Sequence, residues 1–133
     1  IANYLSLTHP YSVDLYIGNT ARHAKIVIIR LLGGVSYWSY GVQQLRALAE
    51  TSAVKVVFLS GDGKTDPELT YLSSVDAANS MALSAYLDAG GIDNAHGFLG
   101  KIADLLNDSD HAPPVRPLMR AGLYWPGLID IDF

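Results

Sequence analysis

A short run with the composition of a ligand-binding loop follows the first apolar segment of the chain. Arg30 lies near the end of that segment, and Gly33, Gly34, Tyr37 and Tyr40 follow it within ten residues. Aromatic rings can stack on a planar ligand, and an arginine can pair with a carboxylate through two parallel hydrogen bonds. We therefore take these five residues as candidate ligand-binding residues. The competing interpretation is that the glycines permit a tight turn and the aromatic side chains pack in a core or on a neighbouring domain.

A second glycine run, Gly61-Asp62-Gly63, follows the next apolar segment. Ligands of open parallel sheets bind beyond the carboxyl ends of the strands, which is where both glycine runs are expected. Asp62 has a side chain that could contact a ligand amide or a metal, so Gly61 and Asp62 join the candidate ligand-binding residues. The alternative is a turn in which the aspartate accepts backbone hydrogen bonds.

Several familiar catalytic and cofactor-binding patterns are absent from the sequence. It contains no cysteine, no phosphate-binding Gly-x-x-x-x-Gly-Lys run and no His-Glu-x-x-His. Its four histidines do not stand three or four residues apart, as two ligands on one helical turn would. They are His9, His23, His96 and His111. We predict no catalytic residue and no metal ligand in this segment, although distant histidines could still converge in space.

Composition and charge restrict the class of protein. The 133 residues suit one domain, half of them are hydrophobic, and the net charge is −4 with the nine basic residues scattered along the chain. Phosphate contacts dominate the affinity of nucleic-acid binders, so this pattern argues against nucleic acid as a partner. Apolar runs much shorter than the ~20 residues of a membrane helix argue against a membrane partner. We expect a soluble, cytoplasmic protein.

Two nearly continuous apolar runs predict buried parallel strands. They cover residues 25–31 and 54–59, and both are rich in valine and isoleucine. Such continuous runs are typical of strands that helices cover on both faces. A helical pattern over residues 40–51 lies between them, so the three segments predict a right-handed βαβ unit.

Four further helices are predicted by apolar spacing and by capping residues. We expect the first to begin at Ser12, the second to have Asp66 as its N-cap, and the third to be capped by Ser73. The fourth is expected to open at Asp93. The four ranges are residues 12–23, 67–73, 73–89 and 93–107.

The last part of the chain is predicted to be a loop followed by a third strand. Residues 107–117 are polar and contain prolines, which favours an exposed, mobile loop. Residues 119–125 have the pattern of a strand. Three strands make a thin sheet for so many helices, and we expect further strands from outside the segment. The predicted fold is α/β, a partial flavodoxin-like arrangement of three layers on a parallel sheet.

Five runs of residues together resemble the large subunit of aerobic cobaltochelatase, the CobN type. The most distinctive are residues 30–41 (RLLGGVSYWSYG) and residues 120–127 (RAGLYWPG). The other three are residues 7–16 (LTHPYSVDLY), residues 61–63 (GDG) followed by residues 66–69 (DPEL), and residues 90–95 (GGIDNA). Their order and spacing are similar to the family over nearly all 133 residues. The family commonly has an acidic residue where this chain has Gly63, so a role for that second acid does not carry over.

The resemblance implies a segment from the N-terminal region of a multidomain enzyme subunit. The family inserts Co²⁺ into hydrogenobyrinic acid a,c-diamide in aerobic cobalamin biosynthesis, as a ligase that forms nitrogen–metal bonds. ATP is hydrolysed by AAA+ partner subunits. In this view Arg30 and the aromatic residues would form part of a macrocycle-binding wall. No cofactor and no catalytic base is expected in residues 1–133, and the segment alone is expected to be inactive.

Three other functions compete with that interpretation. The segment could be a non-catalytic scaffold, whose aromatic run at residues 37–40 anchors another domain or the ATPase partner. It could belong to the related H subunit of magnesium chelatase, which acts on protoporphyrin IX. A free-standing flavodoxin-like binder of small ligands is the third, and the missing phosphate-binding loop weakens it.

Overall fold

The chain folds around a two-stranded parallel sheet in the computed structural model, which describes residues 1–117. Strand β1 is Ile26–Leu31 and strand β2 is Lys55–Ser60. They pair in register from Ile26 opposite Lys55 to Leu31 opposite Ser60. Helix α2, Ser39–Thr51, connects them. Both predicted strands and the predicted βαβ unit are therefore confirmed, with bounds shifted by about one residue.

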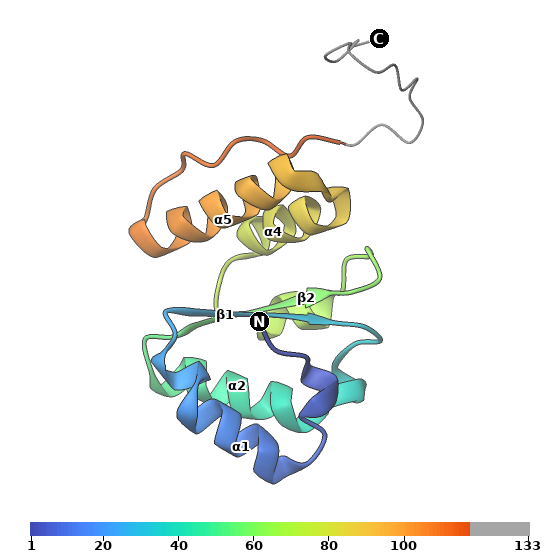
Figure 1. Cartoon of the computed structure of the whole chain (residues 1–133), viewed down its shortest axis with the longest axis vertical. Helices are drawn as coiled ribbons and strands as arrows, with labels where there is room; N and C mark the ends of the chain where they lie inside the picture. The colour runs from blue at the N-terminus through green and yellow to red at the C-terminus, as the bar shows by residue number, and fades with distance from the viewer. Residues whose placement is uncertain (118–133) are drawn as a thin grey trace.

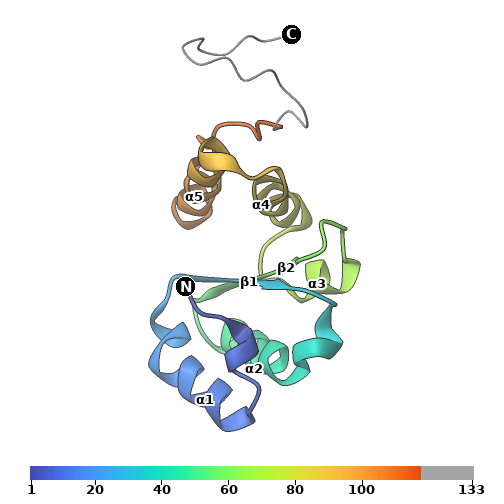
Figure 2. The ribbon, with the colours of Figure 1, turned by 45° about the vertical axis from the view of Figure 1, so that its right-hand side comes forward.

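Helices cover both faces of this sheet, which confirms the predicted layered α/β class. Helices α1 (Pro10–Asn19) and α2 lie on one face, and helices α4 (Ala77–Ala89) and α5 (Gly91–Asn107) lie on the other. Figures 1 and 2 show this separation from two directions. None of the helices described in residues 1–117 has both the length and the apolarity that a membrane crossing requires.

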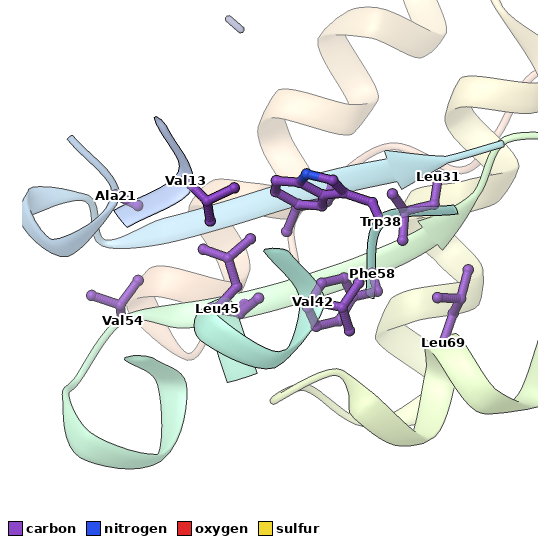
Figure 3. Packing of buried hydrophobic residues seen from close by; sticks show 11 residues of the cluster. Val13, Ala21, Leu31, Trp38, Val42, Leu45, Val54, Phe58 and Leu69 are labelled. Atoms are coloured by element: carbon purple, nitrogen blue, oxygen red, sulfur yellow. The ribbon is translucent and has the colours of Figure 1, made fainter. Parts of the chain in front are cut away.

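Alternate residues of β2 supply the two halves of the core. Val56 and Phe58 point towards α1 and α2 and pack in the larger cluster shown in Figure 3. Val57 and Leu59 point the other way and pack against α4 and α5. All four side chains are at least 97% buried. A strand buried on both faces needs apolar residues at every position, and for that reason the run carries no polar alternation.

The first helix begins earlier than predicted. Helix α1 starts at Pro10, and the Nδ1 atom of His9 accepts a hydrogen bond from the backbone N–H of Tyr11 at 3.2 Å. Proline disfavours helical backbone in the residue before it, so His9 is extended and takes the N-cap position expected of Ser12. The helix also stops at Asn19, and a short 3₁₀ turn, η2 (Ala21–His23), occupies the rest of the predicted range.

One predicted cap of the middle helices is confirmed and one is wrong. Asp66 caps helix α3, Pro67–Leu72, by accepting from the N–H groups of Glu68 and Leu69 at 2.9 and 3.3 Å. Helix α4 is capped by Asp76, which accepts from the Asn79 N–H, and not by Ser73. The Ser73 hydroxyl instead accepts from the backbone N–H of Phe58 at 2.9 Å.

The last helix ends at Asn107 as predicted but starts at Gly91, two residues before Asp93. The polar segment that follows has no regular structure, yet it is fastened to the helix layer. Backbone N–H groups of His111 and Ala112 donate to the buried carboxylate of Asp104 at 2.8 and 2.7 Å. The expected exposure of this segment is confirmed for most of its residues, and the hydrogen bonds to Asp104 are a feature that the sequence did not predict. The strand predicted over residues 119–125 lies outside the described residues.

Candidate functional site

The carboxyl ends of β1 and β2 lie side by side and carry both glycine runs. Gly61 donates its N–H to the Leu31 carbonyl at 2.6 Å, and a Cβ atom at Gly61 would lie 3.0 Å from that oxygen. Such a close approach of two backbones leaves little room for a side chain. The two loops that follow the strands therefore start side by side, held together by the backbone contact between Leu31 and Gly61.

Gly33 and Gly34 bend the chain after β1 and place Tyr37 beside it. Their φ angles are +90° and +78°, a region that side-chain-bearing residues rarely adopt. The Tyr37 ring lies against Gly33, where a Cβ atom would meet it at 2.6 Å. Tyr37 is 75% exposed, so one face of its ring is open to a ligand or to another protein surface.

The neighbouring aromatic residues turn inward, which corrects the idea of a continuous exposed run at residues 37–40. Trp38 is buried and donates its Nε1–H to the Leu7 carbonyl at 2.8 Å. The hydroxyl of Tyr40 donates to the carboxylate of Asp14 on α1 at 3.0 Å, and this hydrogen bond raises the pKa of Tyr40. Of the two predicted aromatic ligand-binding residues, Tyr37 is exposed, whereas the hydroxyl of Tyr40 is already hydrogen-bonded to α1.

Arg30 points to the opposite face of the sheet and already has an acidic partner. Its guanidinium forms an ion pair of 2.6 Å with Asp88 near the end of α4. Asp88 also accepts from the Ser84 hydroxyl at 3.2 Å. The two charged side chains are 41% and 31% exposed, so the pair contributes modestly to stability. A ligand carboxylate could reach Arg30 there by sharing it with Asp88.

Asp62 is held in a turn. Its carboxylate accepts hydrogen bonds from the Ser60 hydroxyl and from the Lys64 backbone N–H. These bonds, the Ser60 one above all, lower the pKa of Asp62. This is the arrangement that the turn interpretation predicts, in which the aspartate accepts hydrogen bonds from groups of its own loop.

A small cleft with both polar and apolar lining lies between this loop and α4. Its volume is about 200 Å³, and polar side chains from both elements line it. They include Ser60, Lys64, Asp66, Ser80, Ser84 and Asp88. The Ser80 hydroxyl is buried and has no hydrogen-bond partner among the described residues. Sequence reasoning missed the helix side of this cleft, although a serine or aspartate at every fourth position from Ser80 to Asp88 is a visible polar stripe.

No group of three or more potential metal-binding side chains comes together within residues 1–117. His9 caps α1, and the exposed His111 lies 3.6 Å from Asp104 at the far end of α5. The carboxyl edge of the sheet therefore has one exposed aromatic ring, one guanidinium that is already paired with a carboxylate, and a small cleft.

Asp66, the N-cap of α3, lies at the end of the loop that follows β2. A Cβ atom at Gly34 would lie 3.5 Å from an Asp66 carboxylate oxygen, so Asp66 lies next to the first glycine loop. We expect Asp66→Ala to destabilise α3 by about 1 kcal/mol, the usual cost of losing an N-cap. Hydrogen exchange of residues 60–72 in the intact protein would measure this loss. Glu68→Ala is the matched control, because that carboxylate lies in the first turn without capping it; an equal loss in both variants would contradict the assignment.

The sequence of the whole chain is similar to that of known proteins. No family model matches it. It is 45% identical over 127 residues to the aerobic cobaltochelatase subunit CobN of Sinorhizobium sp., a match that covers 96% of this chain and 10% of that protein. It is 38% identical over 127 residues to the subunit of the same name from Pseudomonas aeruginosa, covering 95% of this chain and 10% of that protein.

A solved structure agrees with the sequence relatives. The catalytic subunit of cobaltochelatase from Mycobacterium tuberculosis superposes with a TM-score of 0.71 at 30% sequence identity. The match covers 85% of this chain and 10% of that one. The chain thus spans about a tenth of the length of the relatives it matches.

Proposed function

Because the chain belongs to the CobN family of aerobic cobaltochelatase subunits, we propose that it forms part of a wall of the tetrapyrrole site in an enzyme that inserts Co²⁺. The observation that carries this proposal is the 45% identity to a cobaltochelatase subunit along almost the whole chain. The substrate we propose is hydrogenobyrinic acid a,c-diamide, in the aerobic synthesis of cobalamin. We propose AAA+ subunits as the partners that hydrolyse ATP, and the cytoplasm as the location.

The chemical demands of metal insertion suit a wall more than a catalytic centre in this segment. Co²⁺ must lose bound water and two pyrrolic nitrogens must lose protons, which a closing pocket around macrocycle and metal would favour. Tyr37 could stack on the planar macrocycle, and Arg30 could bind one of its peripheral carboxylates. The proton acceptor and the metal ligands would lie elsewhere in the subunit.

The activity can be tested with the intact subunit and its ATPase partners. Purified complex, Co²⁺, ATP and hydrogenobyrinic acid a,c-diamide should give the cobalt-containing product, followed by its absorption spectrum. Omitting ATP or the partner subunits should abolish turnover. The same complex with Mg²⁺ and protoporphyrin IX is the comparison for the magnesium alternative. Insertion of magnesium but not cobalt would refute the proposal.

The role of Arg30 gives a separate prediction. If its guanidinium binds a peripheral carboxylate, Arg30→Ala should lower kcat/KM about 10- to 100-fold, mainly through KM, because a charge-assisted hydrogen bond is lost. Asp88→Asn is the matched variant, since it removes the internal partner and leaves the guanidinium free. It should lower KM or leave it unchanged. Equal kinetics for Arg30→Ala and the unchanged enzyme would remove Arg30 from the wall.

A scaffold role is the second candidate, and the exposure of Tyr37 favours it as much as it favours binding. The internal pairing of Arg30 with Asp88 also fits a segment that holds its own shape. Titration of the intact subunit with the macrocycle separates the two roles. Tyr37→Ala should weaken macrocycle binding if this face is a wall, whereas unchanged affinity with weaker binding of the ATPase partner would establish the scaffold.

A further inference from the structure

The two outer edges of the sheet differ in whether their backbone groups have hydrogen-bond partners. The outer edge of β2 is closed by the serines that follow α3. The Ser74 hydroxyl accepts from the Val56 N–H at 2.7 Å, the Ser73 hydroxyl accepts from the Phe58 N–H, and the Ser74 N–H donates to the Val56 carbonyl at 2.8 Å. No further strand can pair there without displacing them. β1 pairs with β2 on one side, and its other side has no strand in the part of the chain that the structure describes.

The backbone groups on that open side can be identified from the register. The carbonyls of Lys25 and Leu31 accept from the N–H groups of Lys55 and Gly61, at 3.0 and 2.6 Å, so these odd-numbered residues face β2. Because successive residues of a strand point to opposite sides, Ile26, Ile28 and Arg30 direct their N–H and C=O groups away from β2. Such an array of backbone donors and acceptors is satisfied by another strand.

These backbone groups form the floor of a slot between the two helix layers. The groove along residues 26–30 has a volume of about 540 Å³. Tyr4, Trp38 and Leu45 line it from the layer of α1 and α2, and Phe98 and Ile102 line it from α5. An occupant must be extended, must offer backbone hydrogen bonds along one edge, and must be apolar towards both layers. Those are the properties of an inner strand of a parallel sheet.

We propose that this slot, called here the β1 slot, holds a parallel β-strand from the part of the polypeptide that precedes Ile1 in the intact subunit. Crossover connections between parallel strands are right-handed, so helices on one face always carry the chain in the same direction across the sheet. Helix α2 leads from β1 to β2, and helix α1 lies on the same face. A strand that reaches β1 through α1 therefore lies on the side of β1 opposite β2, which is the side of the slot.

The ends of the described chain fit this direction. Ile1, Ala2 and Tyr4 line the slot, so a segment joined to Ile1 would arrive beside it. The C-terminal end of the described chain lies at the wrong end of the slot to continue into a strand parallel to β1. Arg116 is hydrogen-bonded to Asn94 in the first turns of α5, whereas the start of β2 contacts the last turns of α5 through Lys55 and Leu105. A strand parallel to β1 must enter the slot at that second end.

Hydrogen exchange at single-residue resolution in the intact subunit tests the proposal. The amides of Ile26, Ile28 and Arg30 should exchange at least about a hundredfold more slowly than free amides, because the added strand protects them. A matched subunit that begins at Ile1 should lose this protection, while the amides of Val27 and Ile29, which face β2, keep theirs. Fast exchange at the three residues in the intact subunit would overturn the proposal. So would protection that persists in the shortened subunit, because a later segment or a second copy would then fill the slot.

A proline substitution gives a second measurement. Proline is tolerated at an edge position whose N–H faces solvent, but not at a position paired on that side. In the intact subunit, Ile28→Pro should therefore accelerate exchange throughout β1 and β2 far more than Ile28→Ala. Both substitutions shorten the isoleucine side chain, but alanine keeps the backbone N–H. Equal effects of the two substitutions would show an unpaired edge and contradict the proposal. This inference concerns the fold alone, so it can fail while the proposed cobalt insertion stands.

Discussion

Replacing Gly41 by alanine should destabilise the first turn of α2 by about 1–3 kcal/mol, the usual cost of overpacking a core. The Trp38 ring lies directly on Gly41, and a Cβ atom there would overlap the ring carbons. Trp38 cannot move freely, because its Nε1–H is bonded to Leu7 and its ring packs on Tyr4 with centroids 5.6 Å apart. The added methyl group must therefore displace a buried side chain or the helix itself.

The chain offers a matched control for this change in Gly18. It also lies in a helix on the same face of the sheet, and a Cβ atom there would meet nothing within 4 Å. Gly18→Ala should stabilise α1 by up to about 1 kcal/mol, because alanine loses less backbone entropy than glycine in a helix. Hydrogen exchange of residues 10–19 and 39–51 in the intact subunit compares the two. Equal protection in both variants would mean that Trp38 is not fixed as described.

This contact also shows where sequence reasoning stopped. Helical spacing over residues 40–51 predicted α2 correctly, and the aromatic run before it was visible. Whether Trp38 faces the core or a ligand depends on the turn made by Gly33 and Gly34, which no periodicity contains. The structure turns Trp38 inward and leaves Tyr37 outside, so one aromatic residue of the run is available for binding and its neighbour is not.

Helix starts were predicted less well than strands for a physical reason. Several residues compete for each N-cap, and the winner depends on what else each side chain can bind. Ser73 was a reasonable cap by sequence, but its hydroxyl satisfies the edge of β2, which leaves Asp76 to cap α4. The continuous apolar runs of β1 and β2 contain few polar side chains that could compete in this way, and β2, which is buried on both faces, allows little else.

Only part of the candidate site could be predicted, again because side-chain partners depend on tertiary packing. The positions of the glycine runs beyond the strands followed from the order of elements, and Gly61 lies where two backbones touch. The partners of Arg30 and Tyr40 did not follow, because Asp88 and Asp14 are brought to them by other helices. Pairing across layers is decided by tertiary packing and leaves no local pattern in the sequence.

Asp104 should make the attachment of the segment after α5 sensitive to acid. Its side chain is 6% exposed and accepts from the Ser109 hydroxyl and from the N–H groups of His111 and Ala112. The Ser109 hydrogen bond above all, with the two backbone amides, lowers the pKa of Asp104 to about 2. An aspartate in an unfolded chain has a pKa of about 3.9.

The sign of the pH dependence follows from these two pKa values. Because the folded state binds its proton less readily than the unfolded state, the attachment is at full strength above pH ~4 and weakens as the pH falls towards ~2. In the intact subunit, the protection of residues 109–112, corrected for the intrinsic exchange rate, should fall over that range relative to residues 39–51. An attachment that depends on the carboxylate in this way should already be weak at neutral pH when the charge is removed.

Asp104→Asn makes that comparison at a pH where the rest of the subunit is undisturbed. The amide keeps the shape but places an NH₂ group where one carboxylate oxygen accepted hydrogen bonds, so residues 109–112 should lose protection at pH 7. Asp110→Asn is the control, since that carboxylate is 88% exposed and contacts only the Lys101 ammonium, at 3.3 Å, among the described side chains. Loss of protection in both variants, or in neither, would show that Asp104 does not hold the segment. Loss in Asp104→Asn alone would mean that one buried carboxylate decides how the chain leaves α5.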